Sequence, residues 1–253
     1  DSGWYYASIS MVNQNLGYAA CKNSFYYGIT QSKFGVTHNG GISWQWTDYP
    51  PLNVRQTYCL AFADSLHGVA VIRNSIDYVY TIQTSDGGQS WNETFKLKDD
   101  DGSLNGVRLA CAKNGDFYIA SCIYTEQTYF DNIRKSTDYG LTWNNLTYNS
   151  SSWVKGFSEL KTYGDSIVVA MDYNQGVTGT LAKNIFISLD AGSSWNTATK
   201  PDTLAVNDPS AFGFRTSENA FLWVGNGDHH QLAVTYNLSH FQPVDYYFSA
   251  NIM

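Results

Sequence analysis

Short runs of apolar and β-branched residues, separated by turn residues, fill most of this chain. Residues 57–63, 68–72 and 78–83 are typical, because each run has the length of a strand and ends at a cluster of Asn, Asp, Gly or Ser. The same succession recurs at residues 107–112 and 117–123. No segment has the 3.6-residue period of an amphipathic helix. The pattern therefore predicts an all-β protein of short antiparallel strands.

An eight-residue motif recurs about every fifty residues, at 37–44, 84–91, 136–143 and 188–195. Each copy reads hydroxyl residue, Asp or Asn, Gly, hydroxyl residue, Trp. A fifth, eroded copy lies at residues 235–241, where Ser replaces Gly and Phe replaces Trp. The motif residues of the four clear copies are Asn39, Gly41, Trp44, Asp86, Gly88, Trp91, Asp138, Gly140, Trp143, Asp190, Gly192 and Trp195.

These residue types predict a tight hairpin. The Asp or Asn oxygen accepts backbone N–H bonds within the turn, and Gly supplies positive φ. The Trp that follows should enter the core and anchor the outgoing strand. We therefore interpret the motif acids as structural and not catalytic.

The segments before and after each motif predict four strands per repeat. A four-stranded antiparallel unit cannot bury both faces alone, so neighbouring repeats must stack, and radial closure is common for this repeat length. We expect one domain over residues 1–253, a β-propeller of about five four-stranded antiparallel blades. An incomplete larger propeller is the alternative. The blades are expected at about 4–50, 51–98, 104–150, 155–200 and 208–253.

The four motifs resemble the Asp-box, or bacterial neuraminidase repeat, of sialidases, sortilin-type receptors, xyloglucan-cleaving glucanases and photosystem assembly factors. The resemblance implies that each box forms the turn between the third and fourth strands of a blade. It also implies that function lies at the opposite end, on the loops between the second and third strands and on the loops that join successive blades. The loops between the second and third strands are expected around residues 23–27, 73–77, 124–131, 172–178 and 225–230.

These expected loops carry aromatic and polar residues suited to stacking on sugar rings or to a protein interface. Ordinary packing between blades is the alternative role for the aromatic residues. The candidate ligand-binding residues are Tyr26, Tyr27, Tyr124, Tyr129, Asp172, Tyr173, Asp228 and His229.

Charge and composition narrow the class of partner. The formal net charge is -7 and the 15 Lys and Arg residues are scattered, which argues against nucleic acid or an anionic membrane as the main partner. No apolar run has the length of a membrane span. The chain begins at Asp1 without an initiator Met or a signal-peptide pattern, so we expect a processed, secreted protein.

Cysteines and sequons bear on the same expectation of secretion. Cys21, Cys59, Cys111 and Cys122 have no metal-binding spacing, so we expect no metal or other cofactor, and either two disulfides or four buried thiols. N-glycosylation sequons begin at Asn92, Asn145, Asn149 and Asn237. Under the Asp-box resemblance, Asn92 and Asn145 follow a box and lie on exposed outer strands, where glycans block edge pairing.

Two functional classes remain. The favoured one is a secreted, non-enzymatic glycoprotein that binds glycan or protein, or that assembles with itself as an extracellular structural component. The alternative is a glycoside hydrolase, although the Arg-Ile-Pro signature and the arginine-rich site of a sialidase are missing. Another hydrolase would need two facing carboxylates. The candidates are Asp77, Glu126, Asp131, Asp172 and Asp228.

Overall fold

The computed structural model describes most of the chain as strands and tight turns, with no helix among the described residues. None of these residues forms an apolar helix long enough to cross a membrane. The described residues are 4–23, 31–48, 54–74, 78–98, 103–125, 128–148, 154–175, 181–182, 184–198, 209–226 and 229–249.

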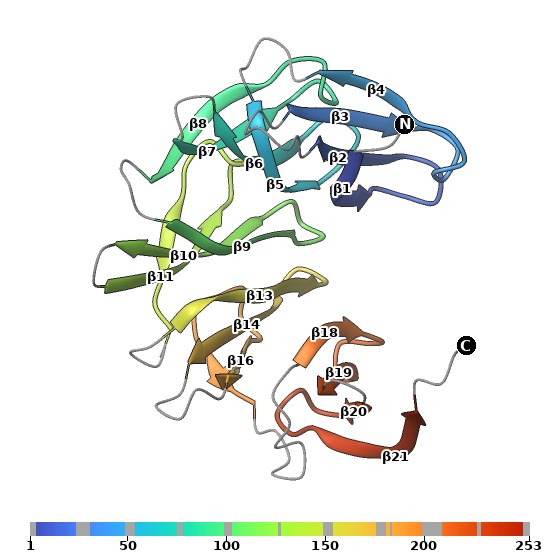
Figure 1. Cartoon of the computed structure of the whole chain (residues 1–253), viewed down its shortest axis with the longest axis vertical. Coiled ribbons are helices and arrows are strands. Elements are labelled where there is room, and N and C mark those ends of the chain that lie inside the picture. Colours follow the sequence, from blue (N-terminus) through green and yellow to red (C-terminus); the bar gives the residue numbers. More distant parts are fainter. Residues whose placement is uncertain are drawn as a thin grey trace. The chain divides into compact units, whose positions relative to one another are not determined.

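Five antiparallel sheets follow one another along the sequence (Figure 1). In each sheet the strands lie side by side in chain order, and the fourth sheet has one extra short strand, β15, paired with β14. This confirms the predicted all-β propeller fold with about five four-stranded blades, and we number the blades from the amino terminus.

The strands of the first two blades are β1 (Trp4–Met11), β2 (Gly17–Asn23), β3 (Gln31–Thr37), β4 (Gln45–Asp48), β5 (Val54–Phe62), β6 (Gly68–Asn74), β7 (Val79–Thr84) and β8 (Asn92–Lys98). Those of the third and fourth are β9 (Ser103–Cys111), β10 (Phe117–Thr125), β11 (Thr128–Ser136), β12 (Asn144–Leu146), β13 (Val154–Tyr163), β14 (Ile167–Gln175), β15 (Leu181–Ala182), β16 (Ile185–Ser188) and β17 (Asn196–Thr197). The fifth has β18 (Pro209–Phe214), β19 (Ala220–Asn226), β20 (His229–Thr235) and β21 (Gln242–Ser249).

The chain divides into two compact units. Unit 1 comprises Asp1–Gly102, Arg108–Ile119 and Arg134–Asn145, and unit 2 comprises Ser103–Val107, Ala120–Ile133 and Leu146–Met253. The third blade contributes residues to both units. The expectation of a single domain over residues 1–253 stays a prediction.

Each unit has its own apolar core. In unit 1, Tyr18 and Phe34 of the first blade pack with Phe62, Ile82 and Trp91 of the second. In unit 2, residues of β14 and β16 in the fourth blade pack with Leu222 and Phe241 of the fifth. The second strand of a blade is buried on both faces, as in β6, where Gly68 to Ile72 are all buried. This explains why these strands are continuous apolar runs rather than alternating ones.

The Asp-box forms one hydrogen-bonded clasp that is repeated from blade to blade. In the second blade, the Thr84 hydroxyl donates to Asp86 Oδ1 at 2.8 Å and accepts the Gly88 N–H at 2.9 Å. Asp86 also accepts the Ser90 N–H at 2.9 Å and the Ser90 hydroxyl at 2.6 Å. Equivalent bonds join Ser136, Asp138, Gly140 and Thr142, and Ser188, Asp190, Gly192 and Ser194.

The first and fifth boxes are variants with an amide in place of the carboxylate. Asn39 Oδ1 still accepts the Ser43 N–H, but its Nδ2 donates to the Ser43 hydroxyl, so this bond runs in the opposite direction. In the fifth box, Asn237 Oδ1 accepts the N–H groups of Ser239 and His240. The eroded copy therefore forms a hydrogen-bonded turn, and the buried Phe241 stands where the other boxes have Trp.

The box indoles are less buried than the sequence predicts. Trp91 enters the core of unit 1, whereas Trp44, Trp143 and Trp195 are only half-buried. Trp143 and Trp195 instead donate their Nε1–H to the carbonyl of the box Gly, at 3.1 Å in both cases. Trp143 still packs against the buried Ala61, Val69 and Phe117. The prediction that every indole is buried in the core is thus wrong for Trp44 and Trp195, whereas Trp143 contacts the core and stays partly exposed.

The second Gly of a box faces the preceding blade. Gly88 lies against the Phe34 ring, Gly140 against the Val69 side chain and Gly192 against the Leu146 side chain, each where a Cβ would be 2.3–2.5 Å from the neighbouring carbon. All three have φ between 87° and 91°. Glycine is therefore required here both for backbone conformation and for the close approach of adjacent blades.

All four cysteines carry free thiols, so the alternative of two disulfides is not supported. Cys21, Cys59 and Cys122 are buried, and Cys111 is half-buried. Cys111 adjoins the β9–β10 turn, which closes with the Ala112 N–H bonded to the Asp116 carbonyl at 2.8 Å, whereas Cys122 lies far along β10. Burial raises the pKa of the Cys59 thiol to about 12, so this thiol is not a nucleophile at neutral pH.

Replacing Gly140 by Ala should lower the free energy of unfolding by about 2–4 kcal/mol, because it adds a strained positive φ and a Cβ against the stiff, buried Val69. Gly164→Ala is the matched control: Gly164 also has positive φ, but nothing lies within 4 Å of its Cβ position. Urea denaturation of both variants measures the difference. Equal destabilisation would show that the blade contact at Gly140 is unimportant.

The Asp190 carboxyl should titrate far below an ordinary Asp. The hydroxyl and N–H of Ser194 and the hydroxyl of Ser188 lower its pKa to about 2. Because the folded pKa lies below the unfolded value of about 3.9, the clasp contributes stability above pH ~4 and loses it as pH falls towards 2. Carboxyl-detected NMR titration measures this pKa, and Asp190→Asn should remove this pH dependence. A midpoint near 3.9 would contradict the clasp.

Candidate functional site

Most of the predicted ligand-binding residues cannot be compared with the structure. Tyr26, Tyr27 and Asp228 lie outside the described residues, as do Asp77 and Glu126 of the hydrolase alternative. The backbones of five further candidates lie in strands, but their side chains are outside the described part: Tyr124 in β10, Tyr129 and Asp131 in β11, Tyr173 in β14 and His229 in β20. Their roles stay predictions.

Asp172 is the predicted site residue whose side chain the structure places. It is fully buried on β14. Its Oδ1 accepts the Asn184 N–H and Nδ2–H, both at 3.0 Å, and its own N–H donates to the Asn184 carbonyl at 3.1 Å. The carboxylate thus ties β14 to the residue before β16 and is not presented to solvent.

A cluster of exposed aromatic side chains lies on the first blade, and sequence reasoning missed it. We call Tyr6, Trp44 and Trp46 the aromatic layer. Trp44 and Trp46 are stacked with ring centroids 5.7 Å apart and planes 27° apart. The Tyr6 ring lies 6.1 Å from Trp46. Tyr6 is 62% exposed and Trp46 36% exposed, so the rings present a broad π surface to solvent.

A glycine under Trp46 explains why this ring lies flat. Gly35 and Trp46 are cross-strand partners on β3 and β4. The indole covers Gly35 so closely that a Cβ there would be 2.6 Å from two ring carbons. One face of the indole therefore rests on backbone while the ring stays partly exposed, an arrangement known to stabilise strand glycines. A Trp opposite a Gly in a hairpin is the sequence signal that would have identified it.

Polar groups flank the aromatic layer on the same side of the sheet. The register aligns one residue from each strand of the first blade in a row: Tyr6, Cys21, Lys33 and Asp48. On β3 and β4 this row lies two residues from Gly35 and Trp46, so both rows are on the same face of the sheet. Asp48 is exposed. An indole platform with a nearby carboxylate and ammonium can stack on the C–H face of a sugar and hydrogen-bond its hydroxyls.

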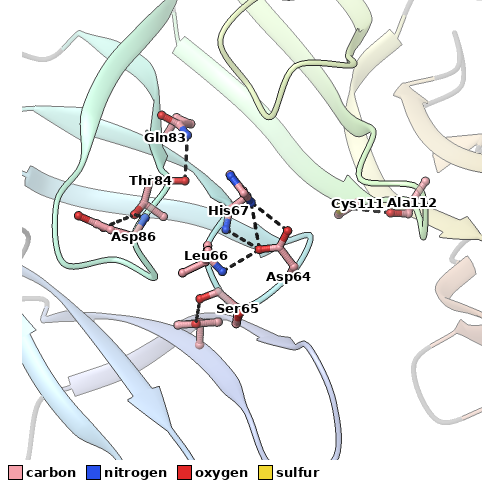
Figure 2. A network of polar contacts seen from close by, with 10 residues as sticks. Asp64, Ser65, Leu66, His67, Gln83, Thr84, Asp86, Cys111 and Ala112 are labelled. Carbon is pink, nitrogen blue, oxygen red and sulfur yellow. Dashed lines mark hydrogen bonds and ion pairs between the residues drawn. The ribbon is translucent and has the colours of Figure 1, made fainter.

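Several other described carboxylates are engaged in local structure. The Asp116 carboxylate pairs with Lys135 at 2.8 Å. Asp64 Oδ1 accepts the N–H groups of Leu66 and His67, and its Oδ2 lies 2.9 Å from His67 Nδ1 (Figure 2). Partial desolvation opposes ionisation of Asp64, but these bonds outweigh it and lower the pKa of the carboxyl. No group of three metal-ligand side chains occurs in the described part of the chain.

Comparison with known proteins identifies the fold. No family model matches the sequence, and no curated protein matches it either. Among solved structures, a protein of unknown function from Dyadobacter fermentans has a TM-score of 0.60 at 14% identity, covering 94% of this chain and 80% of that one. The Hadza microbial sialidase Hz136 has a TM-score of 0.59 at 11% identity, covering 92% and 56%.

A sialidase from Trypanosoma rangeli, solved with sialic acid, has a TM-score of 0.55 at 13% identity, covering 92% of this chain and 46% of that one. This chain therefore spans about half the length of the two sialidases. It shares the β-propeller fold of these two sialidases, which agrees with the fold that the Asp-box resemblance implies.

Gly35→Ala should displace the Trp46 indole, because the new Cβ would overlap the ring. The fluorine chemical shift of Trp46 in protein labelled with 5-fluorotryptophan reports this displacement. The Trp46 signal is assigned as the one that is lost in Trp46→Phe. Gly213→Ala, in a strand glycine with nothing within 4 Å, is the control and should leave the Trp46 signal in place. An unmoved signal in Gly35→Ala would mean that the ring does not rest on Gly35.

Proposed function

We propose that this chain is a secreted, non-enzymatic propeller module that binds glycans, and that the aromatic layer of the first blade is its contact surface. The observation that carries the proposal is the flat, partly exposed Trp46 held on Gly35 and extended by Trp44 and Tyr6. Aromatic rings bind well where little side-chain freedom is lost, and Trp46 is already fixed in place.

A protein ligand and self-assembly belong to the same proposal as alternatives. The four residues of β4 are all exposed, so this outer strand has side chains available to another chain. The size of the protein in solution distinguishes self-assembly from glycan binding, since a self-assembling chain forms oligomers at high concentration.

The competing function is a glycoside hydrolase. The shared fold of the two sialidases supports it, because propeller sialidases demonstrate that this scaffold can carry glycosidase chemistry. Against it, six of the described acids, Asp64, Asp86, Asp116, Asp138, Asp172 and Asp190, are committed to turns, a salt bridge or a buried contact. Two carboxylates facing one another across a cleft are what this function requires.

Secretion and glycosylation are part of the proposal. Asn92 and Asn145 are exposed and follow the box Trp of their blades, on the outer strands β8 and β12. Asn237 is exposed as well, with its Oδ1 committed to the fifth box. Asn149 lies outside the described residues. A mass shift on treatment with an N-glycosidase, after expression in secreting eukaryotic cells, tests this part.

A glycan array on the purified protein tests binding. We expect Trp46→Ala to weaken binding to any glycan that is recognised by about tenfold or more, because each stacked ring contributes on the order of 1 kcal/mol beyond its buried area. Tyr6→Ala should weaken it less. The control is Tyr236→Ala, another exposed tyrosine that lies in the fifth box.

Chromogenic glycosides assayed beside the array test the hydrolase. If the wild type hydrolyses a glycoside and Trp46→Ala hydrolyses it at the same rate, the hydrolase is favoured and its active site lies away from Trp46. Unchanged glycan binding in both aromatic variants would reject the aromatic layer as the contact surface.

A further inference from the structure

The box end of unit 1 exposes apolar side chains at a junction between the second and third blades. We call Leu66, His67, Tyr139 and Leu141 the box-end patch. Leu66 is 50% exposed, Tyr139 38% and Leu141 54%, and the His67 side chain is 27% exposed. The His67 and Tyr139 rings are stacked, with centroids 4.2 Å apart and planes 22° apart. The patch is therefore continuous across two blades.

The turn that carries the patch is held rigidly on both sides. The Leu66 carbonyl accepts the N–H of Gly87, within the second box, at 2.9 Å, and the Ser65 carbonyl accepts the Tyr18 hydroxyl at 2.7 Å. Figure 2 shows this turn beside Thr84 and Asp86. Asp64 caps the turn from within. A surface fixed in this way loses little conformational entropy when a partner binds.

Tyr139 is an unusual residue for its place in the box. It has φ of 58°, a left-handed conformation that the first two boxes satisfy with Gly40 and Gly87, the fourth with Ala191 and the fifth with Leu238. A bulky aromatic residue is disfavoured there, so the turn does not need tyrosine. The ring stacks on His67, lies 3.2 Å from the Cβ position of Gly115 in the β9–β10 turn, and still leaves a partly exposed π surface that a partner can contact.

The surroundings of the patch are acidic. Asp64 precedes Leu66, Asp86 precedes the Gly87 that bonds to Leu66, and Asp138 precedes Tyr139. Burial is the largest single effect and raises the pKa of all three carboxyls, but their hydrogen bonds together outweigh it and lower the pKa, so they are ionised at neutral pH. Of the nearby cations, Lys135 is paired with Asp116 and Lys113 is exposed on the β9–β10 turn.

We propose that the box-end patch binds a segment of a partner protein in which an arginine lies between apolar residues. The guanidinium would stack on the Tyr139 ring and pair with Asp64 or Asp138, as arginine does with aromatic rings and carboxylates. The apolar residues would cover Leu66 and Leu141. Antiparallel strands place the β5–β6 turn and the third box at the same end of their blades, and the box-end patch shares no residue with the aromatic layer.

NMR titration of isotope-labelled protein with N-acetyl-Leu-Arg-Leu-amide tests the proposal. We expect shifts confined to the backbone amides of residues 64–67 and 138–142, with saturation in the millimolar range typical of so short a ligand. N-acetyl-Leu-Glu-Leu-amide should bind at least about tenfold more weakly, and sodium chloride at 0.5 M should weaken the arginine peptide, because charge attraction is screened. Equal binding of the two peptides, or shifts elsewhere, would overturn the proposal.

Tyr139→Gly separates recognition from folding. Glycine is the residue type of the first two boxes and adopts this positive φ without strain, so the variant should fold while binding the arginine peptide at least about fivefold more weakly. Tyr236→Ala is the control and should bind normally. Trp46→Ala should also bind normally, so failure here is distinguishable from failure of the glycan proposal. Unchanged binding in Tyr139→Gly would rule out the stacking role.

Discussion

A single side-chain oxygen closes each hairpin on which the blades depend. Oδ1 of the box Asp or Asn accepts a backbone N–H that the tight turn leaves without a strand partner, and the preceding hydroxyl residue bonds to the same oxygen. In the three boxes with aspartate, this fixes the turn so that its second glycine meets the preceding blade. Local polar chemistry therefore sets the geometry in which large apolar surfaces pack.

The sequence predicts this level of structure well because turn chemistry is local. The box spacing and the apolar runs give the five sheets, and even the eroded fifth copy forms a turn around Asn237. Burial of the indoles could not be predicted in the same way, because it depends on what the neighbouring blade provides. Trp91 meets the aromatic core of Phe34 and Phe62, whereas Trp143 and Trp195 bond to their own turns.

The candidate surfaces were harder to predict because they arise from register and from contacts between blades. Trp46 is exposed as a platform because Gly35 lies opposite it, and Tyr139 joins His67 only when the second and third blades are adjacent. Asp172 illustrates the converse. As a polar residue near an expected loop it was a candidate ligand contact. On the strand, however, its carboxylate accepts hydrogen bonds from Asn184. Sequence position alone does not separate these outcomes.

The first and fifth boxes have asparagine where the other three have aspartate, and this difference affects how the protein unfolds in acid. Asn39 and Asn237 cannot gain a proton, whereas Asp86, Asp138 and Asp190 can. Strong acid therefore weakens the hairpins of the second, third and fourth blades and spares those of the first and fifth. Acid unfolding should begin in the three aspartate-containing blades, while the first and fifth blades retain their turns.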